Sequence, residues 1–152
     1  MLTYLPKIQQ FSGGSEPKMR NITLMSKKSA PSVLVVDDEA LIRWSLAEML
    51  GERGYTVTEA GDARVALAAI ESAEKPFDVV LLDYRLPDSA DLRLLEKVRR
   101  LAPSSQVIMI TAHNSPELAQ GAAALGAFRV ISKPFEVESL ASLVSEARAA
   151  SM

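Results

Sequence analysis

The sequence predicts an α/β fold, a single doubly wound domain in which five parallel strands alternate with five helices. Three observations support this prediction. Strand-like and helix-like segments alternate strictly over the part of the chain that follows Pro31. The strand-like segments are short and continuously apolar, which indicates strands buried on both faces of a parallel sheet. No segment repeats at the period of a solenoid protein.

The first elements follow directly after Pro31. The β-branched run 33–36 predicts a strand, and the helical spacing of apolar residues over 40–53 predicts a helix. Gly54 is a natural end for this helix, because glycine readily adopts the left-handed conformation found at helix C-termini. Trp44 lies on the same helix and is expected to pack in the core. Residues 55–60 predict a second strand.

The remaining elements continue the alternation. Asp62 is a candidate N-cap of the second helix, which Pro76 is expected to break, and Pro103 is expected to end the third helix. The segment FDVVLLD is the clearest buried strand, and it ends on Asp83. After the second helix, the predicted strands and helices occupy, in chain order, residues 77–83, 94–102, 106–111, 116–125, 128–132 and 137–147.

The composition excludes several kinds of site. The chain has no cysteine, which excludes disulfides, thiolate metal sites and cysteine nucleophiles. His113 is its only histidine, which excludes multi-histidine metal sites. No apolar stretch approaches the roughly 18 to 20 residues that cross a bilayer. We therefore expect no membrane segment, and the cytosol is the expected compartment.

The charges divide unevenly along the 152 residues, whose net charge is −2. Residues 1–32 carry five basic residues and one acidic residue, which gives +4, so the remainder carries −6. An acidic body argues against direct nucleic acid binding by this domain, since phosphate contacts need basic residues. Residues 1–31 lack periodicity and contain three prolines, which predicts a disordered extension before a domain at 32–150. A translation start at Met25 would also explain the extension.

Four of the five predicted strands end in a polar group. Taken singly, an aspartate after a strand is usually a turn former or helix cap, and a threonine there is usually a half-buried strand residue. A lone lysine normally extends to water. Ligands of doubly wound sheets, however, bind at the carboxyl ends of the strands. The coincidence therefore indicates a site, and its candidate residues are Asp37, Asp38, Asp83, Thr111 and Lys133.

The chemistry of these residues indicates a phosphoryl group and a hard cation. If the first and third strands are neighbours, the carboxylates of Asp37, Asp38 and Asp83 repel one another unless a cation or shared protons intervene. With oxygen ligands only, the expected cation is Mg²⁺, with Mn²⁺ as a substitute. The Thr111 hydroxyl and the Lys133 ammonium suit phosphate oxygens. Asp83 is the best candidate to accept the phosphoryl group, as an acyl phosphate.

These residues resemble the receiver domain of two-component response regulators, the CheY-like family. The resemblance rests on VLVVDDE at the first strand, DVVLLDYRLPD around Asp83, MITAH around Thr111 and ISKPF around Lys133. It covers residues 32–150, and DYRLPDSADLRLL is most similar to receivers that precede sigma-54-dependent activators. The resemblance implies the flavodoxin-like strand order 2-1-3-4-5. It also implies a signalling module that catalyses only its own phosphotransfer and dephosphorylation, and not a metabolic enzyme.

The resemblance further implies a role for each site residue. Asp83 would accept the phosphoryl group from a phosphohistidine of a sensor histidine kinase. Asp38 would bind Mg²⁺ directly, Asp37 through a metal-bound water, and Arg85 through its backbone carbonyl. Thr111 would donate a hydrogen bond to a phosphoryl oxygen and start the conformational switch.

Other family features concern the surroundings of the phosphoryl group. Lys133 would pair with a phosphate oxygen, and its peptide bond to Pro134 is expected to be cis. Ala112 would leave room for the phosphodonor. Arg85 and His113 would tune the lifetime of the phosphoryl group, although His113 is equally explained as an exposed loop histidine. The family also implies a homodimer through the fourth helix, fifth strand and fifth helix, and switched contacts with an effector.

Two positions depart from the family pattern. Ala90 and Asp91 replace an acidic residue or asparagine followed by glycine, which stiffens the loop unless Asp91 caps the third helix. Val130 replaces the aromatic residue that couples to Thr111. Phe128 is expected on the same strand face as Val130, because side-chain direction repeats every two residues, but too far from Thr111 to take over. We expect phosphorylation to persist and its propagation to be weakened or replaced.

Two other interpretations remain open from the sequence. A phosphatase of the haloacid-dehalogenase type also uses aspartate and Mg²⁺, but it needs a second aspartate two residues after the nucleophile, where Arg85 stands. A pseudo-receiver would be a binding module that accepts no phosphate. The departures at Val130 and at residues 90–91 favour it, whereas the intact acidic residues, Thr111 and Lys133 disfavour it. The sequence also leaves open a stand-alone receiver and a piece of a larger regulator.

Overall fold

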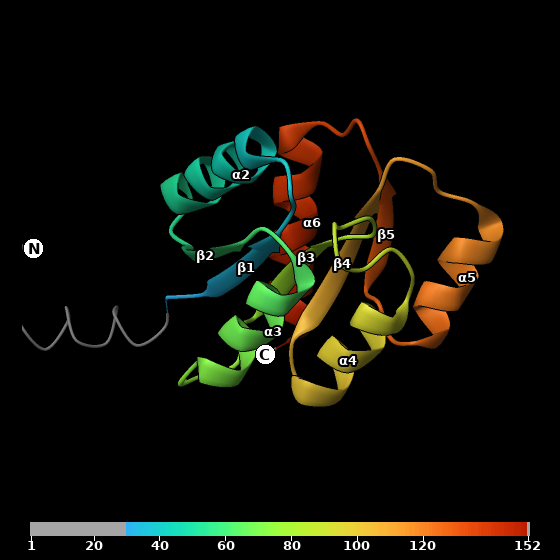
Figure 1. Cartoon of the computed structure of the whole chain (residues 1–152). Coiled ribbons are helices and arrows are strands. Elements are labelled where there is room, and N and C mark those ends of the chain that lie inside the picture. Colours follow the sequence, from blue (N-terminus) through green and yellow to red (C-terminus); the bar gives the residue numbers. More distant parts are fainter. Residues whose placement is uncertain (1–29, 152) are drawn as a thin grey trace, which may run out of the picture. The chain divides into compact units, whose positions relative to one another are not determined.

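A computed structural model of the chain describes residues 30–151, which form a five-stranded parallel sheet with five helices. The strand order is β2-β1-β3-β4-β5, as predicted. The predicted N-terminal extension, residues 1–31, lies outside the described residues except for its last two. In chain order (Figure 1) the elements are β1 (Ser32–Val36), α2 (Ala40–Glu52), β2 (Thr56–Ala60), α3 (Ala63–Ser72), β3 (Val79–Asp83), α4 (Arg93–Leu101), β4 (Gln106–Thr111), α5 (Pro116–Ala124), β5 (Arg129–Ser132) and α6 (Val137–Ala150).

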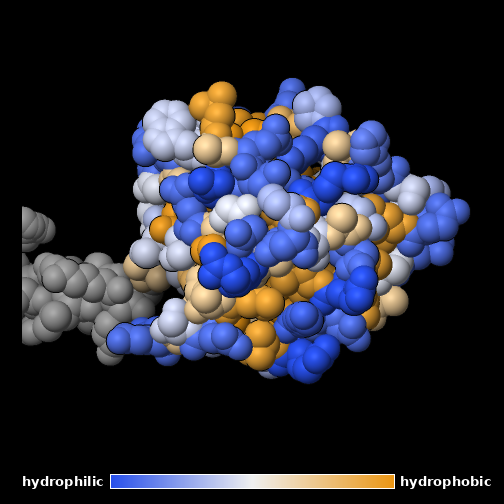
Figure 2. All heavy atoms as spheres, in the orientation of Figure 1, coloured by the Kyte–Doolittle hydropathy of each residue, from blue (hydrophilic) through white to orange (hydrophobic). Residues whose placement is uncertain are grey.

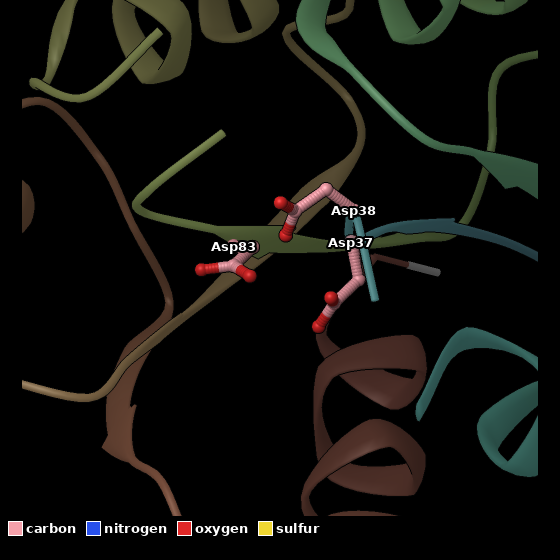
Figure 3. A group of neighbouring side chains, drawn as sticks. All are labelled: Asp37, Asp38 and Asp83. Carbon is pink, nitrogen blue, oxygen red and sulfur yellow. The ribbon is translucent and has the colours of Figure 1, made fainter. Parts of the chain in front are cut away.

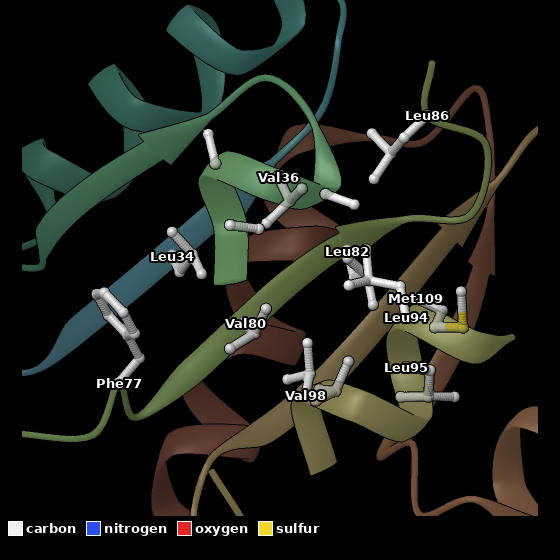
Figure 4. Packing of buried hydrophobic residues seen from close by; sticks show 14 of the residues in the cluster. Leu34, Val36, Phe77, Val80, Leu82, Leu86, Leu94, Leu95, Val98 and Met109 are labelled. Atoms are coloured by element: carbon white, nitrogen blue, oxygen red, sulfur yellow. The ribbon is translucent and has the colours of Figure 1, made fainter. Parts of the chain in front are cut away.

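The sheet separates two hydrophobic clusters. The α3–α5 cluster joins one face of the sheet to α3, α4 and α5, and Figure 4 shows its packing. The α2–α6 cluster joins the other face to α2 and α6. Successive residues of β1 and β3 enter the two clusters in turn, and every one of β3 is buried, which explains why the sequence shows continuous apolar runs. Each fully buried Val or Leu contributes about 1.5–3 kcal/mol to folding.

The helix boundaries confirm most of the predicted signals. Gly54 follows α2 with a φ of +93°, and the Asp62 side chain accepts a hydrogen bond from Val65 N at 2.8 Å at the start of α3. The prediction for Pro76 was wrong. The helix α3 ends at Ser72, and Ala73 is already extended, so Pro76 lies in the connection to β3 and does not break the helix.

Trp44 does not pack in the core, contrary to the prediction. Its residue surface is 57% exposed, and Leu41, one turn earlier on α2, is 75% exposed. The buried stripe of this helix is filled by Leu46, Met49 and Leu50, and positions 41 and 44 lie on the opposite side. Figure 2 shows hydrophobic surface at the top edge of the molecule over α2, and a second hydrophobic area between α3 and α4.

Phe128 and Val130 pack against different clusters, which corrects the prediction that they share a strand face. Val130 packs against the α3–α5 cluster, whereas Phe128 packs against the α2–α6 cluster. The strand β5 begins at Arg129, so Phe128 precedes the strand and the two-residue alternation does not extend to it. None of the helices within residues 30–151 combines the length and apolar character that a membrane-spanning helix requires.

Candidate phosphoacceptor and metal site

The parallel sheet brings the candidate residues to one edge. Val36 pairs with Leu82 in the register of β1 and β3, so Asp37 and Asp83, the next residues along, lie side by side. Thr111 ends β4 opposite Ser132 of β5, and the backbone N–H of Lys133 donates to the Thr111 carbonyl at 2.7 Å. The proximity predicted from the strand ends is therefore present in the fold.

Three carboxylates converge at this edge (Figure 3). One oxygen from each of Asp37, Asp38 and Asp83 lies within 4.8 Å of the others. Asp37 is 2% exposed and Asp83 is 6% exposed, whereas Asp38 is exposed. Backbone groups orient the two buried carboxylates: Glu39 N donates to Asp37 Oδ1 at 2.8 Å, and Arg85 N donates to Asp83 Oδ1 at 3.1 Å. Such a cluster is unfavourable without a positive partner.

Lys133 supplies that positive charge. Its Nζ lies 3.0 Å from Asp83 Oδ2, 3.2 Å from Asp37 Oδ2 and 3.2 Å from Glu39 Oε1. Burial by itself lowers the pKa of the lysine, but the hydrogen bond and charge of Asp83 and the charge of Asp37 raise its pKa overall. The ammonium is therefore held in its charged form, and the predicted cis peptide bond between Lys133 and Pro134 is present.

Asp37 is the carboxyl group of the cluster whose ionised form is disfavoured. Burial raises its pKa, and the neighbouring charge of Asp83 adds to the rise, while the Glu39 backbone N–H and Lys133 act in the opposite direction. The net result is a raised pKa for the Asp37 carboxyl. In the absence of a further cation, the native site therefore binds a proton more readily than an exposed aspartate does.

The carboxylate cluster fits a hard cation. Asp37 Oδ2 is buried, and its interaction with the described residues is the ion pair with Lys133 Nζ at 3.2 Å, without a further hydrogen bond. A buried oxygen without a hydrogen bond is costly, and a metal ligand or a metal-bound water would satisfy it. Together with the oxygens of Asp38 and Asp83, it forms the all-oxygen donor set that Mg²⁺ prefers.

An open pocket gives access to Asp83. Thr111, which is 3% exposed, lines this pocket, and its Oγ1 accepts a hydrogen bond from His113 N at 3.1 Å. Asp37 is not part of the pocket's lining. The lining residues are Asp38, Glu39, Asp83, Arg85, Leu86, Pro87, Thr111, Ala112, His113 and Lys133. Arg85, Ala112 and His113, to which the family resemblance assigns roles near the phosphoryl group, thus line this pocket.

Two contributors to the site were missed in the sequence. Glu39 lies in the quoted segment VLVVDDE, but only its contact with Lys133 across 94 residues shows that it belongs to the pocket. Asp88 reaches from the loop after β3 to the start of α3, where its two oxygens accept hydrogen bonds from Ala63 N at 2.8 Å and Arg64 N at 3.1 Å. No local sequence pattern indicates this long-range cap.

The loop after β3 is held at further points. Leu86 and Ser89 exchange backbone hydrogen bonds of 2.7 and 3.2 Å, and the Leu86 side chain is buried in the α3–α5 cluster. Asp91 Oδ1 accepts from Arg93 N at 2.9 Å, although Leu92 occupies the N-cap position of α4. Asp91 therefore accepts a hydrogen bond from the first backbone N–H of α4, as the sequence suggested, but it lies one residue before the N-cap position. These contacts hold the loop in place, and Asp91 contributes one of them from the position where the family pattern has glycine.

Comparison with known proteins agrees with this geometry. Residues 33–145 match the response regulator receiver domain family. The chain is 38% identical over 115 residues to the DNA-binding transcriptional regulator NtrC of Salmonella typhimurium, an alignment that covers 76% of this chain and 24% of NtrC. It is 39% identical over 111 residues to the transcriptional regulatory protein PdtaR of Mycobacterium tuberculosis, covering 71% of this chain and 52% of PdtaR. The chain thus spans about a quarter of the NtrC length.

Solved structures show the same architecture. A CheY-like response regulator receiver domain protein from Methanospirillum hungatei superimposes with a TM-score of 0.76 at 33% identity, over 81% of this chain and 97% of that one. The structure of NtrX from Brucella abortus gives a TM-score of 0.71 at 36% identity, over 80% of this chain and 27% of NtrX. With the family match over most of its length and the carboxylates, threonine and lysine at one sheet edge, this chain belongs to the response regulator receiver domain family.

Proposed function

We propose that this receiver accepts a phosphoryl group on Asp83 from a phosphohistidine of a sensor histidine kinase, with Mg²⁺ bound at the carboxylate cluster. The observation that carries this proposal is the environment of Asp83. Its Oδ2 lies 3.0 Å from Lys133 Nζ, oxygens of Asp37 and Asp38 lie within 4.8 Å, and the pocket reaches it from solvent. The ammonium and a cation can together neutralise the charge of an incoming phosphoryl group.

Asp83 is a better acceptor than its two neighbours. Asp37 does not line the pocket and is only 2% exposed, so it offers little access to a donor. Asp38 does line the pocket, but it is exposed, and the described residues give its carboxylate no cationic partner. Only Asp83 combines access with a lysine at 3.0 Å and a threonine hydroxyl on the same pocket wall. Asp37 and Asp38 are therefore assigned to the cation, together with the Arg85 backbone carbonyl.

The proposed reaction is a simple phosphoryl transfer. An oxygen of Asp83 forms a bond to phosphorus while the bond between phosphorus and the histidine nitrogen breaks, and the histidine, protonated on its other ring nitrogen, leaves with the electron pair as a neutral imidazole. Water later attacks the phosphorus of the acyl phosphate, which returns the carboxylate and releases inorganic phosphate. When bound, Mg²⁺ neutralises the developing charge on the phosphoryl oxygens. Lys133 pairs with one phosphoryl oxygen, and the Thr111 hydroxyl donates a hydrogen bond to another.

The proposal extends to the partners of the domain. The chain catalyses only its own phosphorylation and dephosphorylation, and it acts by changing its protein contacts in the cytosol, without binding nucleic acid itself. The family's homodimer face corresponds here to α5, β5 and α6. On that face, the Arg129 guanidinium lies over the Phe128 ring, 4.7 Å from its centroid, and 3.8 Å from the Glu146 carboxylate.

A direct test uses small phosphodonors and intact mass spectrometry. Incubation with phosphoramidate or acetyl phosphate and Mg²⁺ is expected to add one phosphoryl group to the wild type and none to Asp83→Asn. The matched control is Asp91→Asn, since Asp91 lies outside the pocket and asparagine keeps an acceptor for Arg93 N. EDTA is expected to prevent the adduct. A wild type that gains no phosphoryl group from either donor would contradict the proposal and favour a pseudo-receiver.

A further inference from the structure

Glu39 is a fourth carboxylate at the phosphoacceptor pocket. It follows Asp37 and Asp38 directly, it lines the same pocket as Asp83, and its Oε1 lies 3.2 Å from Lys133 Nζ. Its side chain is 59% exposed, whereas those of Asp37 and Asp83 are 2% and 7% exposed. Glu39 therefore approaches the ammonium from the solvent side of the cluster, where a phosphodonor must enter.

This position gives Glu39 two electrostatic effects. It shares the ammonium of Lys133 with Asp83 and Asp37, so part of the positive charge that a phosphoryl oxygen would use is already engaged. It also makes the net charge of the pocket more negative. Four carboxylates, the Lys133 ammonium and the Arg85 guanidinium, which lines the same pocket, leave two negative charges, and a bound divalent cation would balance these. Neutralising Glu39 would then leave one net positive charge, so an anionic donor would be attracted to the pocket more strongly.

We propose that Glu39 sets the phosphodonor preference of this receiver by charge. It disfavours donors that carry a phosphoryl dianion and no positive charge, and it favours donors whose leaving group is a protonated nitrogen. Acetyl phosphate is of the first kind. Phosphoramidate is of the second kind and carries one negative charge less, because its nitrogen is protonated. The inference rests on the proposed phosphorylation of Asp83.

The two reactions differ only in the leaving group. With acetyl phosphate, an Asp83 oxygen bonds to phosphorus as the phosphorus–oxygen bond breaks, and acetate leaves with the electron pair. With phosphoramidate, the same bond forms as the phosphorus–nitrogen bond breaks, and ammonia leaves. Both give the same acyl phosphate, so a change in the ratio of their rates reports on how each donor meets the pocket and not on the stability of the product.

The test compares Glu39→Gln with the wild type at low salt. Glutamine keeps the length of the side chain and an acceptor for Lys133. An exposed charge at this range changes binding by about twofold per unit of donor charge. The second-order rate constant with acetyl phosphate is therefore expected to rise about fourfold, and that with phosphoramidate about twofold. High salt is expected to shrink both effects, because it screens exposed charges.

A matched control separates this local effect from net charge. Glu48→Gln removes the same charge from an exposed position on α2 that does not line the pocket, and we expect it to leave the ratio of the two rate constants unchanged. The Mg²⁺ dissociation constant, measured by calorimetry without a donor, provides a second readout. It is expected to rise several-fold in Glu39→Gln, because the cluster loses a negative charge, and to stay unchanged in Glu48→Gln.

The outcomes distinguish this inference from the proposed function. If the wild type gains no phosphoryl group from either donor, the proposed function fails and the inference fails with it. If adducts form on Asp83 but Glu39→Gln changes both rate constants by the same factor, or matches Glu48→Gln, then only the role of Glu39 is wrong. A larger gain with acetyl phosphate than with phosphoramidate, together with weaker Mg²⁺ binding, supports it.

Discussion

Replacing Lys133 with methionine is expected to destabilise the metal-free domain by about 3 kcal/mol, because it leaves a buried acidic cluster without its cation. Methionine keeps an unbranched side chain of similar length, so the change removes mainly the ammonium. Asp37 and Asp83 are 2% and 6% exposed and cannot turn to water. Their mutual repulsion, which Lys133 now offsets, would then act unopposed.

The magnitude follows from the distances in the site. At an effective dielectric constant of about 20, each contact near 3 Å represents about 5 kcal/mol of gross attraction. The contact distances are 3.0 Å to Asp83 and 3.2 Å to Asp37. Dehydration of the ammonium, whose side chain is 16% exposed, cancels most of this gain. Removing one partner of such a buried pair costs about 3–5 kcal/mol, and we take the lower end because solvent can reach the pocket.

Urea unfolding in EDTA and in Mg²⁺ measures this effect. The variant is expected to lose about 3 kcal/mol in EDTA, equivalent to about 10 °C in Tm. It should recover much of this loss in Mg²⁺, since a divalent cation neutralises the same carboxylates. Lys75→Met, at an exposed position without an ion pair among the described residues, is expected to cost less than about 0.5 kcal/mol. A loss below about 1 kcal/mol in EDTA, or an equal loss in Mg²⁺, would refute the reasoning.

Three further predictions concern the site and its surroundings. Because burial raises the pKa of Asp37, the native state keeps the proton of this carboxyl to a higher pH than the unfolded chain does. In EDTA, the Tm of Asp37→Asn relative to that of the wild type should therefore increase as the pH rises from 4 to 7. A Tm difference that does not change with pH would contradict this. Asp88→Ala should lower the free energy of unfolding by about 1–2 kcal/mol and speed amide exchange in residues 84–92, whereas Asp62→Ala should lower it by about 1 kcal/mol without affecting that loop. Equal exchange rates in the two variants would show that the contact of Asp88 with α3 does not hold the loop. Val130→Tyr should leave phosphorylation intact and alter phosphorylation-dependent exchange in α5, and unchanged behaviour would argue that no aromatic relay is missing.

Most of the fold could be predicted from local patterns. Local patterns predicted all five strands to within two residues. The apolar runs were clearest for β1, β3 and β4, because strands buried on both faces admit few polar residues. Helix ends were predicted where a single residue controls the backbone, as at Gly54 and Asp62. The end of α3 was not, because the chain leaves the helix at Ser72 to reach β3, before Pro76 has any effect.

Side-chain environments were harder to predict than elements. Trp44 is hydrophobic and lies on an amphipathic helix, but the buried stripe of α2 is already filled by smaller side chains, and 57% of Trp44 is exposed. The prediction for Phe128 relied on the two-residue alternation of side-chain direction, which holds only within a strand, and β5 begins one residue after Phe128. In both cases, the outcome depends on neighbours that are distant in the sequence.

The sequence by itself determined the residue types at the strand ends, and with them the chemistry available to the site. Two adjacent aspartates, a third aspartate, a threonine and a lysine are fixed by position, and a parallel sheet must bring strand ends to one edge. Only the tertiary structure decided which groups touch. It placed Lys133 between Asp83, Asp37 and Glu39, left Asp37 Oδ2 without a hydrogen bond to the described residues, and joined Asp88 to the start of α3. These contacts join residues 25 to 96 positions apart, and their geometry depends on how the helices and loops pack, which no local pattern encodes.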